Sequence, residues 1–219
     1  MGSVSPAHPA DHNSLPAAQS ATVRHIYDFV EQFFQNPQFD ASHDFRHVRR
    51  VTRTAIEIFE AERTANPDLD LYTIILGALL HDVEDKKYAQ SKDAIKLALL
   101  EVGMPEAEAS RLQRLVEGVS YSSEIKDSEK VRLLIAEIPE LAVVQDADRL
   151  DAIGAIGIAR CFTFGGAKDT RSLEESVEHF HDKLFKLEGM MKTETGKVWA
   201  AERTRVLHDF VDCWNREIR

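Results

Sequence analysis

Residues 71–88 read LYTIILGALLHDVEDKKY, a strongly apolar run that ends in an adjacent histidine and aspartate followed by acids and lysines. Apolar side chains occupy so many of its positions that we expect a buried helix over about residues 70–82. His81 and Asp82 follow Ala78 by three and four residues, so both extend the apolar face at the C-terminal end of that helix. A buried carboxylate is strongly destabilising unless it is paired or coordinated. Asp82 therefore needs partners from other parts of the chain.

Almost all of the remaining chain shows the apolar spacing of helices, separated by Asn-Pro, Gly and Pro breaks. We expect about nine helices, over residues 22–35, 42–64, 70–82, 92–102, 105–118, 127–137, 141–160, 173–191 and 194–217. Strand signals are scarce, and the glycines and polar residues of 162–171 indicate a loop. The predicted fold class is all-α, a compact helical bundle in a single domain over residues 21–219, preceded by a disordered tail over residues 1–20.

The composition is that of an ordinary globular protein, because 43% of the 219 residues are hydrophobic and 29% are charged. A formal net charge of −10 argues against a nucleic-acid partner, whereas a small anionic ligand needs only a local cluster of cations. No apolar run approaches the roughly 20 residues of a membrane-spanning helix, so we expect no membrane association. Cys161 and Cys213 lie far apart and suit a reducing compartment. We therefore expect a cytoplasmic protein and leave its oligomeric state open.

Two other helices carry metal-binding residue types on their buried faces. His47 lies four residues before Val51 in the apolar stripe of one helix, and Asp148 lies four residues after Val144 in the stripe of another. Each of these side chains alone would be read as an ordinary hydrogen-bonded core residue. Together with the His-Asp pair at 81–82, however, two imidazoles and two carboxylates are directed inward from three helices. One shared metal ion would satisfy all four groups.

Three segments of the chain resemble the motifs of the HD-domain superfamily of metal-dependent phosphohydrolases. They are SHDFRHVRRV (42–51), GALLHDVED (77–85) and QDADRLDAIGAIG (145–157), which follow the order of a His, a His-Asp pair and a distant Asp. The resemblance covers about residues 23–219, and FHDKLFKLEGMMKTETGK (180–197) is similar to the YpgQ/YedJ-type subgroup. It implies an HD-domain helical bundle with a central metal site. The ligands that it implies are His47, His81, Asp82 and Asp148.

The alignment of the first and last motifs leaves alternatives. The first ligand of the superfamily is usually followed, four residues later, by an apolar residue that faces the core, which favours His47 over His43. An Ala-Asp-Arg-Leu context likewise favours Asp148 over Asp146 as the last ligand. Asp146 and Asp151 then remain candidates for groups that orient the ligands.

Two imidazole nitrogens and two carboxylate oxygens suit one divalent ion, with manganese favoured and iron, cobalt or magnesium as alternatives. Four protein ligands on an octahedral ion leave two positions for water or a phosphate oxygen. The ion would activate a bound water and polarise a phosphoryl oxygen. The sequence has no histidine between Asp82 and Asp148, where superfamily members with a second metal carry further histidines. This difference favours a single metal.

The residues that follow the motifs supply candidates for catalysis and substrate binding. Glu84 and Asp85 come directly after the His-Asp pair and resemble the acidic pair of the ppGpp-hydrolysing branch, so we expect a general acid or base there. Cations stand beside all three motifs in a protein of net charge −10, which suggests a phosphate ligand. The expected substrate contacts are Arg50, Lys86, Arg149, His43, Tyr121 and Lys183.

We therefore expect an enzyme, a metal-dependent phosphohydrolase that acts on nucleotides. The subgroup resemblance implies that a nucleoside or deoxynucleoside triphosphate is split into monophosphate and pyrophosphate by metal-activated water. The alternatives are a 5′-nucleotidase, a triphosphohydrolase that releases intact triphosphate, and a non-catalytic HD-like regulatory domain. Degenerate domains of the last kind usually lose ligands, whereas all four positions are filled here.

Overall fold

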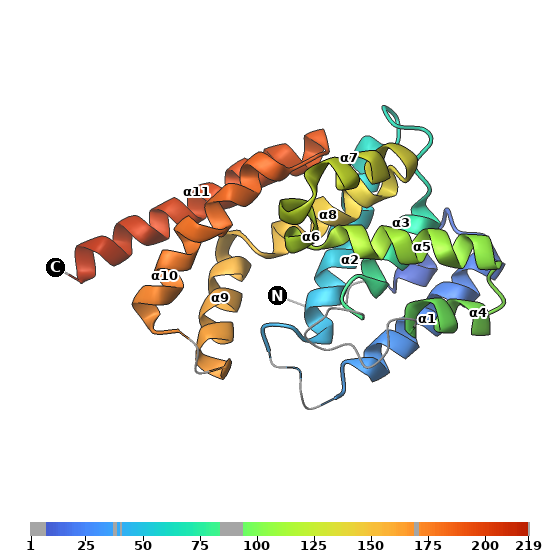
Figure 1. Ribbon diagram of the computed structural model, residues 1–219, viewed down its shortest axis with the longest axis horizontal. Coiled ribbons are helices and arrows are strands. Elements are labelled where there is room, and N and C mark those ends of the chain that lie inside the picture. The colour runs from blue at the N-terminus through green and yellow to red at the C-terminus, as the bar shows by residue number, and fades with distance from the viewer. Residues whose placement is uncertain (1–7, 37–38, 40, 84–93, 169–170, 219) are drawn as a thin grey trace.

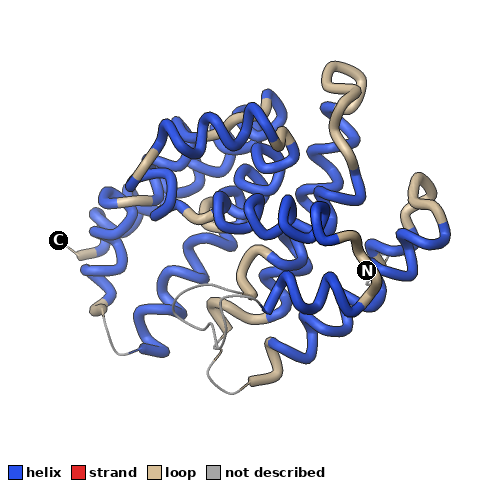
Figure 2. Tube along the Cα trace, turned by 45° about the vertical axis from the view of Figure 1, so that its right-hand side comes forward, coloured by secondary structure: helices blue, strands red, loops and turns tan. Residues whose placement is uncertain are grey.

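The computed structural model describes residues 8–36, 39, 41–83, 94–168 and 171–218 (Figures 1 and 2). Within these ranges it contains eleven α-helices, two 3-10 helices and no strand, so the predicted all-α class is confirmed. The elements in chain order are η1 (Pro9–Asp11), α1 (Ala17–Phe33), α2 (Phe45–Glu62), α3 (Leu71–Leu80), α4 (Ala94–Glu101), α5 (Glu106–Val119), α6 (Tyr121–Lys126), α7 (Ser128–Glu137), α8 (Glu140–Asp151), α9 (Gly154–Lys168), α10 (Leu173–Asp182), η2 (Leu184–Met190) and α11 (Glu194–Glu217).

Helix α3, the apolar helix expected from residues 71–82, lies at the centre of the fold. All of its residues except Tyr72 are buried, and it packs against α1, α2, α5 and α8. Full burial of each Leu or Ile side chain contributes about 1.5–3 kcal/mol, so this helix holds the surrounding helices in place. Gly77 permits the close packing, because a Cβ atom there would lie 2.8 Å from Cδ2 of Leu115 on α5.

Capping residues fix where α2 and α3 begin. The side chain of Asp44 accepts a hydrogen bond from the backbone N–H of His47, which places His47 in the first turn of α2. Asp70 caps α3 by accepting hydrogen bonds from the backbone N–H and the hydroxyl of Thr73. Because α3 ends at Leu80, His81 forms its C-cap and lies at the end of the central helix.

The predicted helix over 141–160 is wrong as a single element, because it breaks into α8 and α9. Gly154 has φ +72°, a left-handed conformation that glycine adopts at little cost. The axes of α8 and α9 therefore differ in direction by 69°. The bend directs α9 away from α8 and toward α10 and α11, and Figure 1 shows α9 and α10 on the side of the molecule where α11 ends.

The predicted loop over 162–171 is also wrong for most of its length, since α9 continues to Lys168. Phe162 packs its ring against Phe180 and Phe210, with centroids 6.3 and 5.7 Å apart. This aromatic packing outweighs the low helix propensity of the two glycines nearby.

Three smaller differences have local causes. The predicted helix over 173–191 divides at Lys183 into α10 and the tighter η2, and the short helix α6 was not predicted. A serine N-cap begins α6, because the hydroxyl of Ser120 accepts a hydrogen bond from the backbone N–H of Ser123. The expected disordered tail includes η1, whose residue Ala10 is 2% exposed and belongs to the core, and the beginning of α1.

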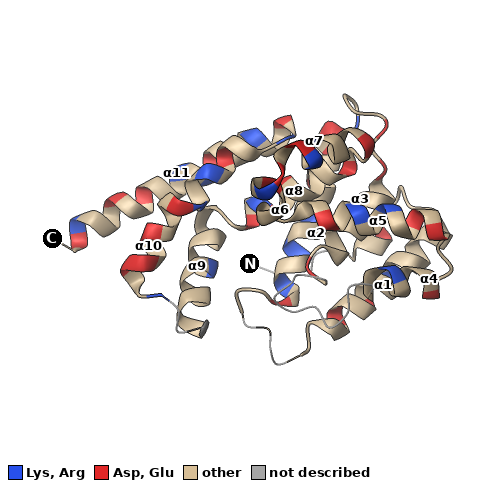
Figure 3. Cartoon of the chain, in the orientation of Figure 1, with Lys and Arg blue, Asp and Glu red and all other residues tan. Residues whose placement is uncertain are grey.

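Most helices in Figure 3 carry both acidic and basic side chains, whereas α3 carries neither, α9 has no Asp or Glu and α10 has no Lys or Arg. Among the described residues, no helix is by itself long and apolar enough to cross a membrane. The bent pair α8 and α9 reaches that length and composition only when the two are taken together.

Candidate metal centre

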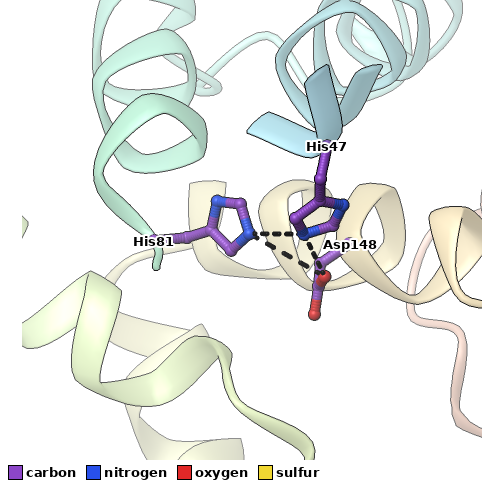
Figure 4. A group of neighbouring side chains, drawn as sticks. All are labelled: His47, His81 and Asp148. Atoms are coloured by element: carbon purple, nitrogen blue, oxygen red, sulfur yellow. Dashed lines mark hydrogen bonds and ion pairs between the residues drawn. The ribbon is translucent and has the colours of Figure 1, made fainter. Parts of the chain in front are cut away.

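Three packed helices bring together the four groups expected to bind metal. His47 comes from the first turn of α2, His81 and Asp82 follow the last residue of α3, and Asp148 lies on α8. Helices α2, α3 and α8 contact one another pairwise. Figure 4 shows His47, His81 and Asp148 converging from these three elements.

The ligand atoms are spaced as a metal ion requires. The Nε2 atoms of His47 and His81 lie 3.2 Å apart, and Oδ2 of Asp82 lies 3.3 and 3.4 Å from them. Oδ1 of Asp148 lies 3.5 and 3.8 Å from the same two nitrogens. With metal–ligand distances of about 2.1 Å, neighbouring ligands of an octahedral ion are about 3.0 Å apart and those of a tetrahedral ion about 3.4 Å apart. His47, His81 and Asp148 therefore form a group that could hold one ion, and Asp82 lies within 3.4 Å of both imidazoles.

Hydrogen bonds on the far side of each imidazole direct its Nε2 atom at this point. Nδ1 of His81 lies 2.7 Å from the carbonyl oxygen of Ala78, and Nδ1 of His47 lies 2.7 Å from Oδ2 of Asp151. A carbonyl and an ionised carboxylate can only accept, so both Nδ1 atoms carry a proton, and Nε2 of each ring is the nitrogen that could bind a metal. The two Nε2 atoms lie 3.2 Å apart, so either a proton on one of them or a metal ion bound to both would join the two rings.

The electrostatics of the cluster also favour a cation. Burial and Arg160 disfavour a protonated His47, yet hydrogen bonds to Asp148, Asp151 and Asp82 raise its pKa to about 10. Burial opposes ionisation of Asp82 and Asp148, but the two imidazoles lower the pKa of both carboxyls. The carboxylates that attract a proton to His47 would equally hold a metal ion in its place.

The carboxylates form the open side of the cluster. The side chains of His47 and His81 are 1% exposed, whereas those of Asp82 and Asp148 are 18% and 27% exposed. A substrate can therefore approach past the two carboxylates, while the imidazoles form the floor of the site.

Asp151 holds His47 in position. Besides His47, it accepts two hydrogen bonds from Arg50, at 2.7 and 2.9 Å, and one from Nη1 of Arg160 at 3.0 Å. Burial opposes its ionisation, but the hydrogen bonds from His47 and Arg50 lower the pKa of Asp151 far below the ordinary value. Asp151 is thus a charged group that fixes the ring of His47, a candidate metal ligand.

Asp146, the alternative to Asp148, turns toward α11. Its carboxylate accepts hydrogen bonds from the backbone N–H groups of Lys192 and Thr193 and from the Thr193 hydroxyl. Gly196 is required for this contact, because a Cβ atom there would lie 2.4 Å from Oδ2 of Asp146. Asp146 therefore anchors the start of α11.

The arginines expected to contact substrate are engaged with other groups of the protein. Arg149 is 2% exposed and donates hydrogen bonds to the carbonyl oxygen of Met190 and to Glu124. Arg50 binds Asp151 and also lines a cavity of about 630 Å³ between residues 8–13 and the outer face of α2. These contacts favour a positioning role for both arginines.

Three other expected substrate contacts lie in the described part of the chain. His43 lies four residues before His47 and ahead of α2, with ring centroids 6.3 Å apart, and Nζ of Lys183 lies 4.9 Å from the centre of the Tyr121 ring. Glu84, Asp85 and Lys86 lie outside the described residues.

Sequence reasoning did not identify Arg160, Arg171 or His179. With His43 and Lys183, these residues line a cavity of about 200 Å³ between residues 42–43, α9 and the junction of α10 with η2. Arg160 stands at the end of a predicted helix and Arg171 in a predicted loop, with no motif around either. Only the bend at Gly154 and the continuation of α9 bring them to the site.

No family model matches the chain. The uncharacterised protein YpgQ of Bacillus subtilis (strain 168) is 35% identical to it over 188 residues, which cover 81% of this chain and 85% of YpgQ. A crystal structure of B. subtilis YpgQ in complex with ADP matches the fold with a TM-score of 0.72 and 28% identity, covering 91% of this chain and 96% of that chain. A crystal structure of an HD-superfamily hydrolase from Bacillus thuringiensis matches with a TM-score of 0.67 and 31% identity, covering 91% and 97%.

The all-α fold, and a centre built from a His, a His-Asp pair and a distant Asp, are those of an HD-superfamily hydrolase. The resemblance seen in the motifs is thereby confirmed across most of the chain. Within this superfamily, the chain belongs to the family of YpgQ.

Proposed function

We propose that the protein is a metal-dependent phosphohydrolase of nucleotides and that His47, His81, Asp82 and Asp148 hold one divalent ion. The observation that carries this proposal is the pair of Nε2 atoms that face each other at 3.2 Å beside two carboxylates. When bound, the ion supplies Lewis acidity, which polarises a phosphoryl oxygen and makes a water molecule more acidic. The mixed nitrogen and oxygen ligands suit manganese best, with iron, cobalt or magnesium as alternatives.

The residues of the chain would orient the substrate and the ligands. Asp151 keeps the Nδ1 proton on His47, and the carbonyl oxygen of Ala78 does the same for His81, so neither ring can rotate away from the centre. Asp82 and Asp148 face the open side, where a phosphate group would enter. Arg50 and Arg160 balance the charge of Asp151 and keep it ionised.

The proposed substrate is a nucleoside or deoxynucleoside triphosphate, split into monophosphate and pyrophosphate. Its support is the resemblance to the YpgQ family, of which one member has been crystallised with ADP, a phosphorylated nucleotide. His43 and Lys183 would contact phosphates, and Tyr121 would stack on the base. Glu84 and Asp85 are proposed as general acid or base and Lys86 as a phosphate contact, all three outside the described residues.

The competing functions differ in their products. A 5′-nucleotidase would release orthophosphate from a monophosphate, and a triphosphohydrolase would release intact triphosphate. A regulatory domain without catalysis is disfavoured, because the four candidate ligands are present and converge. The two free cysteines, one of them exposed, suit the reducing cytoplasm, which we propose as the location.

The test is product identity. Purified protein is analysed for metal, incubated with a panel of nucleoside mono-, di- and triphosphates and Mn²⁺, and followed by ³¹P NMR. We expect monophosphate and pyrophosphate from triphosphates. Asp82→Ala should abolish metal binding and turnover, whereas Asp209→Ala, which alters an exposed His-Asp pair on α11, should leave both unchanged. A metal-loaded protein that hydrolyses none of these nucleotides would overturn the proposal.

A further inference from the structure

A second, larger cavity lies between the outer face of α2 and the first described residues of the chain. Its volume is about 630 Å³, and its walls are residues 8–13 (the N-terminal wall), Tyr27 of α1 and the face of α2 from Arg46 to Glu57. None of the four candidate metal ligands lines it. Small-molecule sites usually measure about 300–1,000 Å³, so the cavity is large enough for a ligand the size of a mononucleotide.

The N-terminal wall is attached to both helices beneath it. Asp11 forms an ion pair with Arg24 of α1, and Nε2 of His12 lies 3.3 Å from Oε1 of Glu60 on α2. Ala10, between these two contacts, is 2% exposed and belongs to the hydrophobic core. The wall is therefore held in place by the fold, as the walls of ligand sites usually are.

Four arginines from the first half of α2 line the cavity. Their spacing of three and four residues places them on one face of the helix, at Arg46, Arg49, Arg50 and Arg53. Two acids are found among the described residues of the walls, and both are paired. Asp11 binds Arg24, and Glu57 lies 3.5 Å from Nε of Arg53. The cavity therefore keeps an excess of positive charge in a protein of net charge −10.

Three of these arginines are available to an anion. Arg46 is 83% exposed, and its contact with Asp44 spans 3.9 Å, close to the limit of about 4 Å for an ion pair. Arg49 has no acidic partner in the described part of the chain. Arg50 donates to Asp151 from Nε and Nη2, whereas its Nη1 makes no hydrogen bond within the described residues. Guanidinium groups in such a cluster favour a carboxylate or a phosphate.

Aromatic and apolar side chains form the other part of the walls. The rings of His8 and Tyr27 lie 4.2 Å apart between centroids, and Pro9 and Ile56 add apolar surface. Burial and the charge of Arg24 lower the pKa of His8 below its ordinary value, against the smaller effects of nearby acids, so its ring is uncharged at neutral pH. A planar ring can pack on this surface and stack against a guanidinium plane.

We propose that this cavity is a second ligand site, which binds a small molecule that has a planar ring and an anionic group, either a phosphate or a carboxylate. Arg46, Arg49 and Arg50 bind the anionic group, and the ring packs against Tyr27 and Ile56. The inference does not depend on the proposed function, because this binding requires neither a metal ion nor hydrolysis.

Isothermal titration calorimetry of the full-length protein in EDTA tests the site with three probes. Adenosine 5′-monophosphate has a ring and a phosphate, 1-naphthoate has a ring and a carboxylate, and adenosine has a ring without a charge. We expect at least one of the two anions to bind, and the one that binds identifies the anionic group. Adenosine should bind at least about tenfold more weakly than adenosine 5′-monophosphate if the phosphate is the group recognised.

A double variant tests the charges. Arg46→Gln combined with Arg49→Gln should weaken binding of the anionic probe by at least about tenfold, because two charge-assisted contacts are lost. Lys186→Gln combined with Arg205→Gln removes the same charge at exposed positions of η2 and α11, and should bind as the wild type does. Circular dichroism verifies that each variant is folded.

A cavity-filling variant tests the space. Ile56→Trp places a larger side chain in the cavity without changing any charge, and should abolish binding. Ile156→Trp is the matched control, because Ile156 lies on α9 and is 46% exposed. It should bind the probe as the wild type does.

The outcomes distinguish this inference from the proposed function. If neither anion binds, or if the folded Arg46→Gln and Arg49→Gln double variant binds as the wild type does, the site is wrongly assigned, whatever nucleotides the protein hydrolyses. Asp82→Ala removes a candidate metal ligand and should bind the probe normally, so loss of binding in that folded variant would also overturn the assignment. A protein that binds the probe in this cavity but hydrolyses no nucleotide would count against the proposed function alone.

Discussion

Replacing Asp151 with asparagine should separate the metal centre from the group that orients it. Asp151 is 6% exposed and accepts hydrogen bonds from His47, Arg50 and Arg160. The amide of asparagine has nearly the same shape but no charge, and its NH2 group would face one of these donors. The change therefore removes both the counter-charge of two arginines and the acceptor that keeps the Nδ1 proton of His47 in place.

Two magnitudes follow from these contacts. Removing one partner of a buried ion pair costs about 3–5 kcal/mol, and because Arg50 is 29% exposed and can be hydrated, we expect the lower end, about 3 kcal/mol, in the free energy of unfolding. Loss of a group that orients a ligand typically weakens metal binding about 10- to 100-fold. That factor corresponds to about 1.4–2.8 kcal/mol of binding free energy.

Urea unfolding in EDTA, followed by circular dichroism, measures the stability change without metal. Isothermal titration with Mn²⁺ measures the affinity of the folded variant. Asp212→Asn, an exposed position on α11, carries the same chemical change and should alter neither quantity. A folded Asp151→Asn variant with wild-type Mn²⁺ affinity would refute the role of Asp151 in orienting His47.

Three further predictions concern stability. Burial opposes ionisation of Glu124, but Lys192 and Arg149 lower its pKa below the usual 4.5. The ionised carboxylate therefore stabilises the fold above pH 4.5, and this stabilisation is lost as the pH falls through the lowered pKa. Glu124→Gln should therefore reduce stability at pH 7 and flatten its decline in acid, as pH-dependent urea unfolding would show; an unchanged profile would contradict this. Gly154→Ala should cost about 1–2 kcal/mol in urea unfolding, because φ is +72° there, and equal stability would show that the bend is unstrained. Removal of bound metal by EDTA should lower the melting temperature, since an ion at 100 times its Kd stabilises by about 2.7 kcal/mol; a melting temperature independent of metal would argue against the site.

Helix periodicity made much of the fold predictable. The apolar stripes of α2, α3 and α8 direct His47, the 81–82 pair and Asp148 to one place, and the structure brings these groups within hydrogen-bonding or ion-pair distance. Their role as metal ligands remains a proposal. Periodicity succeeds here because these helices bury most of one face, so the register of each side chain follows from the positions of its apolar neighbours.

The cavity lined by Arg160, Arg171 and His179 could not be predicted in the same way. Its position depends on the left-handed conformation of Gly154 and on aromatic packing that extends α9 beyond Phe162, both of which are tertiary effects. Neither Arg171 nor His179 lies in a motif that would place it in this cavity. Asp146 and Asp148 present a related difficulty, because two residues on one helix turn toward different partners only once α11 is in place.

The central claim is that one metal ion is held by His47, His81, Asp82 and Asp148. The most direct measurement is an anomalous difference map from crystals of the protein grown with Mn²⁺. The account predicts a single peak, about 2.0–2.3 Å from Nε2 of both histidines and from one oxygen of each aspartate. A peak coordinated by His43 or Asp146, a second metal beside the first, or no peak at this position would contradict it.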